Sequence, residues 1–506
     1  MLKNILEYFD KTADRYESRT AVIEGANEIT FGELKHKSQI LASALLKRKS
    51  LKNTPIAVFL PKSIDSVLSN IAITYSCNIY MNVDVKSPKE RLNNIFNLIQ
   101  PQAIITSTSY YSLIKDIVNE NQIILIDSFD FNQKVDIDLI YTAQNRQIDT
   151  DPLCIINTSG STGTPKGVVL SHRSFIEFTE MSLKTFEFTE HEIIGSLSPL
   201  VFDIYSFELC LLMSKGSTIL LIPEQLSAFP YKILELLEIH KVSFVFWVPT
   251  IMVNIANMNL LEKVTLPFLR IVWFAGEVFP TKQFNYWKRQ LSHVLFANLY
   301  GPIEITLDCT YFIVNRDIPD DEPLPIGKPY KNTDVLILNE FDELVIDGEE
   351  GELCVRGTSL AMGYYNNPDK TAAVFVQNPL NKSYPELIYR TGDIVTKNSF
   401  DEIIFKGRKD SLIKHLGYRI ELGEIEHVLV NNLKMVKNAC VVYQTSRKEI
   451  TLFYESNTEI PPSEFRKQIS LVLPKYMIPT VYIQLIEMPR NKNGKIDRLH
   501  LKEKIY

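Results

Sequence analysis

Short apolar runs recur from the N-terminus to about residue 400, for example at 56–60, 123–126, 218–222 and 244–248. Runs of this length, rich in β-branched and aromatic residues, are typical of buried β-strands. Between them lie segments with apolar residues at helical spacing, such as 90–98. An alternation of buried strands with helices predicts parallel α/β sheets.

The pattern changes before the C-terminal fifth of the chain. Strand-like runs at 334–338 and 351–355 are separated by glycine and aspartate turns. Short strands joined by such turns predict a small β-barrel or an antiparallel appendage.

A further break falls at 407–410, and roughly 95 residues follow it. They mix strand-like runs with helical ones at 422–431 and 462–473, which is enough for a separate α+β domain. We therefore expect a large N-terminal domain over 1–408 and a smaller C-terminal domain over 409–506.

Composition narrows the class of protein. The 506 residues are 45% apolar, enough for two or three cores, and the net charge is −6 with scattered lysines, which argues against nucleic acid as a partner. The six cysteines form no CxxC pair and the eight histidines show no ligand spacing, so we expect reduced core thiols and no structural zinc. The N-terminus does not resemble a signal peptide and no apolar run reaches the ~20 residues of a membrane span. These features predict a cytoplasmic protein that does not bind a membrane.

The most informative segment is the loop at 158–167, which lies between strand-like runs at 152–156 and 168–170. It offers five hydroxyls, three glycines whose backbone can turn N–H groups inward, and the ammonium group of Lys166. A flexible Ser/Gly linker is the alternative, and the common P-loop is excluded because Gly167, not Ser or Thr, follows the lysine. This composition predicts a phosphate-binding loop.

Five further segments carry groups suited to nucleotide chemistry, although each alone has an ordinary structural explanation. Segment 298–304 joins an aromatic residue to a carboxylate, and 389–393 and 407–410 offer a turn-capping aspartate and a cation. Segment 414–426 has the composition of a capped helix start, and 491–498 is a polar turn near the C-terminus.

Taken in order and spacing, these segments resemble the adenylate-forming superfamily of acyl- and aryl-CoA synthetases, luciferases and adenylation domains of nonribosomal peptide synthetases. Further matches are Gly351-Glu352-Leu353, Gly363-Tyr364-Tyr365 and the LPKYMIP sequence at 473–479. The resemblance implies an N-terminal domain of two parallel α/β sheets plus a small β-barrel, and a mobile α+β C-terminal domain hinged at Asp410. It also implies ATP and Mg²⁺ as cofactors, and two half-reactions, adenylate formation and transfer to a thiol.

The resemblance assigns roles residue by residue. Lys495 would bridge the substrate carboxylate and the α-phosphate in the first half-reaction, and Lys414 would enter the site in the second. Glu304 would bind Mg²⁺. The ATP-binding set is Thr158, Ser159, Gly160, Ser161, Thr162, Gly163, Lys166, Asn298, Tyr300, Gly301, Asp393 and Arg408. The sequence departs from the family at Ile303, where the family usually has a threonine whose hydroxyl contacts the α-phosphate. One hydrogen-bond donor to the transition state is therefore missing, unless Thr306 or a backbone amide takes its place.

The segment 202–208 resembles that of amino-acid-activating members, in which the aspartate, here Asp203, pairs with the substrate ammonium group. An N-cap role for Asp203 is the alternative. The family's pocket, carried onto this sequence, consists of Asp203, Ile204, Phe207, Phe246, Trp273, Ala275, Leu299, Leu307 and Asp308. Three large aromatic residues leave little volume, and Asp308 could accept a hydrogen bond from a hydroxyl, so serine is favoured and alanine follows.

Segment 274–280 also resembles enzymes that activate proline, D-alanine or β-amino acids, so these substrates remain open. No carrier segment follows Lys495 in this sequence. We therefore expect the phosphopantetheine thiol of a separate carrier protein as acceptor, with coenzyme A, as in acyl- or aryl-CoA ligases, as the alternative. A catalytically silent nucleotide-binding homologue is the non-enzymatic alternative.

Overall fold

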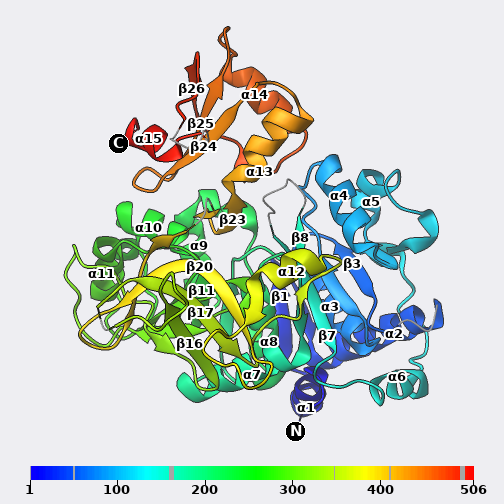
Figure 1. The fold of residues 1–506 in the computed structure, drawn as a ribbon. Coiled ribbons are helices and arrows are strands. Elements are labelled where there is room, and N and C mark those ends of the chain that lie inside the picture. The colour runs from blue at the N-terminus through cyan, green and yellow to red at the C-terminus, as the bar shows by residue number, and fades with distance from the viewer. Residues whose placement is uncertain are drawn as a thin grey trace.

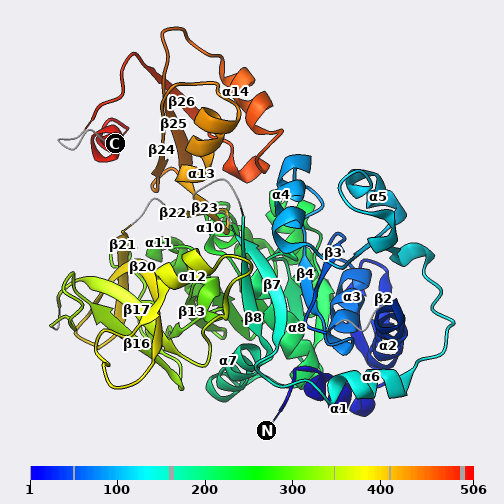
Figure 2. The same ribbon diagram turned by 45° about the vertical axis from the view of Figure 1, so that its right-hand side comes forward.

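The structure is a computed structural model, and it describes residues 2–48, 52–158, 165–346, 348–409, 412–490 and 496–505 (Figure 1). A large body carries the N-terminus, and a smaller lobe, orange to red in Figure 1, sits on top of it. The view in Figure 2 shows the hairpin β22–β23 at the junction of the two.

The first large sheet of the body has nine strands with a parallel centre and antiparallel edges. In spatial order they are β15 (Lys328–Pro329), β14 (Thr310–Ile313), β13 (Leu295–Tyr300), β12 (Ile271–Phe274), β11 (Phe244–Trp247), β9 (Ile193–Ser196), β10 (Thr218–Leu221), β1 (Thr20–Glu24) and β2 (Asn27–Thr30). The strands from β13 to β1 are parallel, whereas β2, β14 and β15 each pair antiparallel with their neighbour.

The second large sheet has seven strands and the same design. Its order is β18 (Gly363–Tyr364), β8 (Lys166–Ser171), β7 (Pro152–Thr158), β4 (Ile79–Asn82), β3 (Pro55–Phe59), β5 (Ala103–Thr106) and β6 (Ile123–Leu125). The strands from β7 to β6 are parallel, and β8 and β18 add antiparallel pairs. The expected parallel α/β sheets are confirmed, with antiparallel strands at their edges.

Alternating side chains explain why both faces of each sheet are covered. In β3, Ile56 and Val58 join the largest hydrophobic core, while Ala57 and Phe59 face a separate cluster on the other side. The largest core also includes residues of the first sheet and of α1 (Leu6–Arg15), α2 (Phe31–Arg48), α3 (Ile64–Tyr75), α6 (Ile137–Gln144), α7 (His172–Thr185) and α8 (Asp203–Lys215). The outer faces are covered by α4 (Lys89–Ile99) and α5 (Thr108–Ile114) on the second sheet, and by α9 (Pro230–Ile239), α10 (Pro249–Asn257) and α11 (Thr281–Gln290) on the first.

A third, antiparallel sheet completes the body and corresponds to the expected β-rich appendage. It contains β16 (Thr333–Leu338), β17 (Gly351–Gly357), β20 (Leu387–Lys397), β19 (Phe375–Gln377) and β21 (Ile403–Arg408), with α12 (Pro368–Val374) beside it. The long strand β20 connects the other members, because it pairs with β17, β19 and β21.

The C-terminal lobe begins with a hairpin, β22 (Leu412–His415) and β23 (Tyr418–Glu421), and has its own hydrophobic core. The rest of the lobe comprises α13 (Leu422–His427), a π-helical turn (Val428–Asn432), β24 (Ala439–Gln444), β25 (Glu449–Glu455), α14 (Pro462–Ile469), β26 (Val481–Leu485) and α15 (Arg498–Glu503). The helix expected over 462–473 is shorter than predicted, because the N–H groups of Leu471 and Val472 bond three residues back and tighten the chain into turns.

Two other expectations meet the structure directly. All six cysteines are buried and free, as their apolar surroundings in the sequence predict. Among the described residues, no helix combines the length and apolar character needed to cross a bilayer.

Candidate functional site

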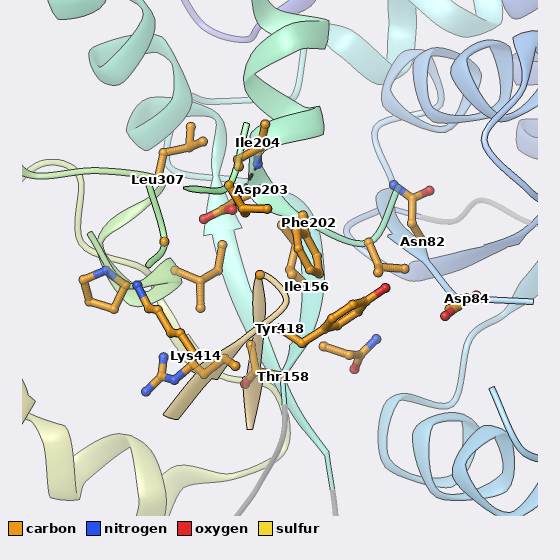
Figure 3. Close-up of a pocket in the computed structure, with 18 of the residues that line it drawn as sticks. Asn82, Asp84, Ile156, Thr158, Phe202, Asp203, Ile204, Leu307, Lys414 and Tyr418 are labelled. Atoms are coloured by element: carbon orange, nitrogen blue, oxygen red, sulfur yellow. Dashed lines mark hydrogen bonds between the residues drawn. The ribbon is translucent and has the colours of Figure 1, made fainter. Parts of the chain in front are cut away.

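A cavity of about 150 Å³ lies where the carboxyl ends of strands from both large sheets meet the C-terminal hairpin (Figure 3). Its walls come from the residues that end or follow β4, β7, β11, β12 and β13, and from the start of α8. The carboxyl ends of parallel strands are the usual binding edge of open α/β sheets, because loops and helix starts converge there. Lys414 and Tyr418 reach into the cavity from the hairpin.

Six of the nine residues assigned to the substrate pocket line this cavity, namely Asp203, Ile204, Phe246, Ala275, Leu307 and Asp308. Phe207, Trp273 and Leu299 are not among its lining residues. They belong to the large core, and the Phe207 and Trp273 rings stack with centroids 5.0 Å apart. These side chains therefore restrict the cavity from behind, and Phe246 is the one of the three aromatic residues that lines it.

Asp203 is the first residue of α8, and its Oδ1 accepts a hydrogen bond from Ile204 N at 3.0 Å. Burial raises the pKa of this carboxyl to about 6, although the nearby Lys414 ammonium opposes the rise. The pKa of Asp308 is held well above its usual value by burial and by the charge of Asp203. Two carboxyl groups therefore share one cavity with Lys414.

Three residues of the predicted ATP-binding set, Tyr300, Asp393 and Arg408, form one connected cluster. The Tyr300 hydroxyl donates to Asp393, and Arg408 pairs with the same carboxylate. Burial, together with the charge of Asp393, raises the pKa of Tyr300 well above its usual value. Next to Tyr300, the Asn298 amide donates to Pro325 O at 2.7 Å. A polar cluster at the end of β13 is thus held by residues distant in sequence.

Gly301 follows β13 at a point where the backbone allows no side chain. A Cβ atom there would lie 2.2 Å from the carbonyl oxygen of Leu307. Gly301 and Leu307 both line the cavity, so this close approach shapes the wall between the nucleotide cluster and the substrate pocket.

Glu304 is completely buried and has two partners. Tyr364 donates to its Oε1 at 2.7 Å, and Arg419 Nη1 lies 2.6 Å from its Oε2. Burial would raise the pKa of Glu304, but the Arg419 guanidinium and the Tyr364 hydroxyl outweigh it and hold the pKa below its usual value. A buried, ionised carboxylate at this place fits a site for a divalent cation.

Lys166, the cation of the predicted phosphate loop, has an analogous partner. Its Nζ lies 2.9 Å from Glu421 Oε1 and 5.5 Å from the centre of the Tyr364 ring. Both Arg419 and Glu421 belong to β23, so one strand of the C-terminal lobe contacts the groups assigned to Mg²⁺ and to the terminal phosphates.

Lys414 is brought to the site by β22. Its Nζ lies 5.9 Å from the centre of the Tyr300 ring, and burial lowers its pKa while Asp393 and Asp308 oppose that change. The structure therefore places the Lys414 hairpin at the cavity, which is the arrangement that the family resemblance implies for the second half-reaction.

Several assigned residues lie outside the described residues, namely Ser159, Gly160, Ser161, Thr162, Gly163, Asp410 and Lys495. The flanking residues of the loop are described. Thr158 pairs with Lys166 across β7 and β8, and Thr158 lines the cavity.

The structure shows where Ile303 and the proposed substitute donor, Thr306, lie relative to the cavity. Ile303 lines the cavity, whereas Thr306, the proposed substitute hydroxyl, is buried and is not among the lining residues. The Thr306 Oγ1 also has no hydrogen-bond partner. The missing donor is therefore not replaced by Thr306 in this arrangement.

Sequence reasoning missed several residues that join the lobe to the body. Besides Arg419 and Glu421, these are Glu424, which pairs with the buried Arg91 at 3.0 Å, and Glu277, which accepts a hydrogen bond from Gly417 N at 2.8 Å. The composition of 414–426 predicts a capped helix start, whereas the helix begins only at Leu422 and 418–421 is a strand. Its period of two places Arg419 and Glu421 on one face, a signal that was present in the sequence.

This fold and this site define a class. Residues 9–365 match the AMP-binding enzyme family, and the chain belongs to it, a family of AMP-forming ligases. The resemblance to the adenylate-forming superfamily is thereby confirmed.

The chain is also similar over almost its whole length to synthases named for peptide and related antibiotics. Tyrocidine synthase 1 of Brevibacillus parabrevis is 30% identical over 507 residues, which cover 99% of this chain and 45% of that protein. Zwittermicin A synthase ZmaJ of Bacillus cereus is 30% identical over 506 residues, covering 98% of this chain and 94% of that protein. The chain thus spans less than half of tyrocidine synthase 1 and nearly all of ZmaJ.

Solved structures agree on the fold. The Vibrio cholerae adenylation domain AlmE, in complex with glycyl-adenosine-5'-phosphate, superposes with a TM-score of 0.84 at 21% identity, over 100% of this chain and 98% of that one. Holo-PA1221, described as an NRPS protein containing adenylation and PCP domains, gives a TM-score of 0.84 at 20% identity, over 99% of this chain and 84% of that one.

Proposed function

We propose that the protein activates a small amino acid, serine or alanine, as aminoacyl-AMP with release of pyrophosphate, and then transfers it to the phosphopantetheine thiol of a carrier protein. One observation carries the proposal. The partly buried carboxylate of Asp203 lines a cavity of about 150 Å³ whose wall also includes Gly301, next to Tyr300 of the nucleotide cluster.

In the first half-reaction, the substrate carboxylate attacks the α-phosphate of ATP, and two anions must be aligned. The Tyr300, Asp393 and Arg408 cluster is suited to adenine and ribose, and Lys166 with the loop that follows Thr158 to the phosphates. Mg²⁺, when bound, would neutralise phosphate charge, and the ionised, buried Glu304 would hold it. Lys495 would supply the cation at the reacting centre.

In the second half-reaction, a thiol attacks the adenylate. Lys414 reaches the cavity from the hairpin, so its ammonium is available to the AMP leaving group in this arrangement. In this arrangement Arg419 pairs with Glu304, and Glu421 pairs with Lys166. These ion pairs support a stage at which Mg²⁺ and pyrophosphate have left.

The cavity supports a small amino acid rather than a fatty or aryl acid. An unpaired buried carboxylate is costly, so Asp203 is expected to pair with a substrate ammonium group. The stacked Phe207 and Trp273 rings lie behind the cavity wall and limit the size of the substrate side chain. Asp308 lines the same cavity and could accept a hydrogen bond from a substrate hydroxyl. Serine therefore precedes alanine, and proline, D-alanine and β-amino acids are the other amines to be compared.

Amino-acid-dependent exchange of pyrophosphate into ATP tests the proposal. The panel comprises the L-amino acids, D-alanine, β-alanine, and several fatty and aryl acids, each with the wild type and with Lys495→Ala. We expect exchange with serine or alanine that is lost in the variant. Exchange confined to acids without an amine would remove the role given to Asp203 and favour an acyl- or aryl-CoA ligase. No exchange with any acid would favour a silent nucleotide-binding homologue.

The acceptor needs its own comparison. Transfer from a preformed adenylate is measured to a phosphopantetheinylated carrier protein and to coenzyme A at equal thiol concentration. Faster transfer to the carrier supports the proposal, and faster transfer to coenzyme A contradicts it.

A further inference from the structure

Among the described residues, polar contacts at five places hold the C-terminal lobe on the body. Three of them use residues already placed in the site, because they involve Glu304, Lys166 or the cavity-lining Arg91. The other two converge on Glu277 and its neighbour Thr250, outside the cavity lining. Neither residue is among those assigned above to ATP or to the amino acid.

Glu277 lies just beyond β12, two residues after the cavity-lining Ala275. Its side chain is 7% exposed and accepts hydrogen bonds from Thr250 N at 3.0 Å and from the Thr250 hydroxyl. Its other oxygen, Oε1, accepts from Gly417 N at 2.8 Å. One carboxylate therefore connects the start of α10 in the body with the turn of the hairpin in the lobe.

Lys448, at the β24–β25 turn of the lobe, adds a second connection to the same place. Its Nζ donates to Thr250 Oγ1 at 3.0 Å and lies 4.0 Å from Glu277 Oε2. A carboxylate that is almost completely buried is thereby compensated by a cation from the other lobe.

The hairpin turn is closely fitted to the body at this point. Gly417 has φ of +81°, and a Cβ atom there would lie 2.9 Å from Val248 Cγ1 and 3.1 Å from Phe202 Cε2. The turn therefore approaches the end of β11 more closely than any side chain would allow. Its backbone N–H is directed at Glu277, where a charged acceptor makes the hydrogen bond strong.

The position of Lys414 depends on this turn. Lys414 is three residues before Gly417 on β22, and β22 and β23 pair through only four residues on each strand. A short two-stranded hairpin has little stability of its own, so its placement is set by what it contacts. Fixing the turn therefore fixes the backbone that carries Lys414 into the cavity.

We infer that Glu277 is a positioning residue for thiol transfer: it holds the hairpin turn, with the help of Lys448, so that Lys414 stays at the adenylate. The inference rests on the proposed function. Adenylate formation, in which Lys495 acts and the hairpin is expected to be withdrawn, does not need this contact.

The test separates the two half-reactions in Glu277→Ala, Glu277→Gln and Lys448→Ala. Lys437→Ala is the matched control, because Lys437 pairs with Glu455 inside the lobe and is 82% exposed. Pyrophosphate exchange reports the first half-reaction, and single-turnover transfer of the amino acid to pantetheine reports the second. Melting temperatures of all variants are compared first.

We expect exchange within about twofold of wild type in every variant, and transfer slowed about tenfold or more in Glu277→Ala, the scale of a lost hydrogen bond to a charged group. Glu277→Gln, which keeps an acceptor for Gly417 N, should recover most of the rate, and Lys448→Ala should lie between the two. Lys437→Ala should match wild type. Unchanged transfer in Glu277→Ala, or equal losses in exchange and transfer, would overturn the inference.

A second measurement does not depend on activity. All six native cysteines are buried, so spin labels can be directed to cysteines introduced at Met258 in the body and Leu471 in the lobe, which are 56% and 60% exposed. We expect the distance distribution between the labels to broaden or shift in Glu277→Ala and not in Lys437→Ala. An unchanged distribution would overturn the inference even if the proposed function failed, whereas absent exchange in the wild type would count against the proposed function alone.

Discussion

At the scale of single residues, the site is defined by charges that are taken out of water. Asp308 and Glu304 are buried, and Asp203 and Lys414 are partly buried, around or beside one cavity; each has a shifted pKa. Burial is the largest cause of the shift for Asp203, Asp308 and Lys414, whereas at Glu304 burial is outweighed by the Arg419 guanidinium and the Tyr364 hydroxyl. Perturbed pKa values of this kind are typical of functional sites, because structural residues seldom retain such costs.

The pKa of Asp203 predicts how amino acid binding depends on pH. Since only the ionised carboxylate pairs with the substrate ammonium group, KM should rise as the pH falls below about 6, the value to which burial raises this pKa. The rise should approach about tenfold per pH unit at lower pH. Steady-state exchange kinetics between pH 5 and 8 would show it. A KM independent of pH in this range, or a wild-type profile shared by Asp203→Asn, would contradict the assignment.

Asp308 should decide between serine and alanine. In Asp308→Ala, the substrate hydroxyl loses its partner, so kcat/KM for serine should fall about tenfold or more while that for alanine changes little. Asp308→Asn is the matched control, because it keeps an acceptor of similar size. Competition between the two substrates in one exchange assay gives the ratio directly, and equal losses for both would exclude this role for Asp308.

Many of the individual site residues could be predicted from the sequence through its resemblance to the family. It assigned Tyr300, Asp393 and Arg408 to one nucleotide site, and the structure brings them together. It did not separate Phe246, which lines the cavity, from Phe207 and Trp273, which do not, because depth behind a wall depends on packing between strands distant in sequence.

At the scale of elements, β23 of the hairpin is the least expected part of the site. Its alternate residues Arg419 and Glu421 contact Glu304 and Lys166, so the strand offers one charge of each sign to groups suited to Mg²⁺ and phosphate. The strand was missed because the segment 414–426 has the composition of a capped helix start, although the alternation of Arg419 and Glu421 was visible in the sequence.

The Arg419 contact predicts competition with Mg²⁺. Because Arg419 and the cation would share Glu304, Arg419→Gln should lower the Mg²⁺ concentration for half-maximal pyrophosphate exchange several-fold and slow transfer to the thiol. Exchange measured over a Mg²⁺ titration tests this. Arg466→Gln, a change in the same lobe far from Glu304 in sequence and near Tyr482, is the control. An unchanged Mg²⁺ requirement would show that the two do not compete.

The turn after β13 predicts a stability effect. In Gly301→Ala, the new Cβ would meet Leu307 O, 2.2 Å away in the present structure, so the backbone must shift at a cost of about 1–3 kcal/mol. We expect a clearly lower Tm in thermal unfolding. Gly407→Ala is the matched control, because nothing lies within 4 Å of its Cβ position. Equal melting temperatures for both variants would contradict this reading of the turn.

At the scale of the whole molecule, the body and the C-terminal lobe share one site. The alternation of apolar runs predicted the sheets of the body, and the change of pattern near residue 335 predicted the antiparallel sheet. The side-chain pairs that join the lobe to the body could not be predicted from the sequence. Arg91 and Glu424, for example, are 333 positions apart, so no local pattern links them. A catalytically silent nucleotide-binding homologue would share this fold, so only an assay of the reaction distinguishes it from an active enzyme.

The most direct measurement of the central claim is the identity of the acid that the protein joins to AMP. The protein is incubated with ATP, Mg²⁺ and an equimolar mixture of amino, fatty and aryl acids, and the bound product is identified by mass spectrometry. The account predicts the adenylate of serine, or of alanine, and its absence in Asp203→Ala. An adenylate of an acid without an amine, or of a large amino acid, would contradict it.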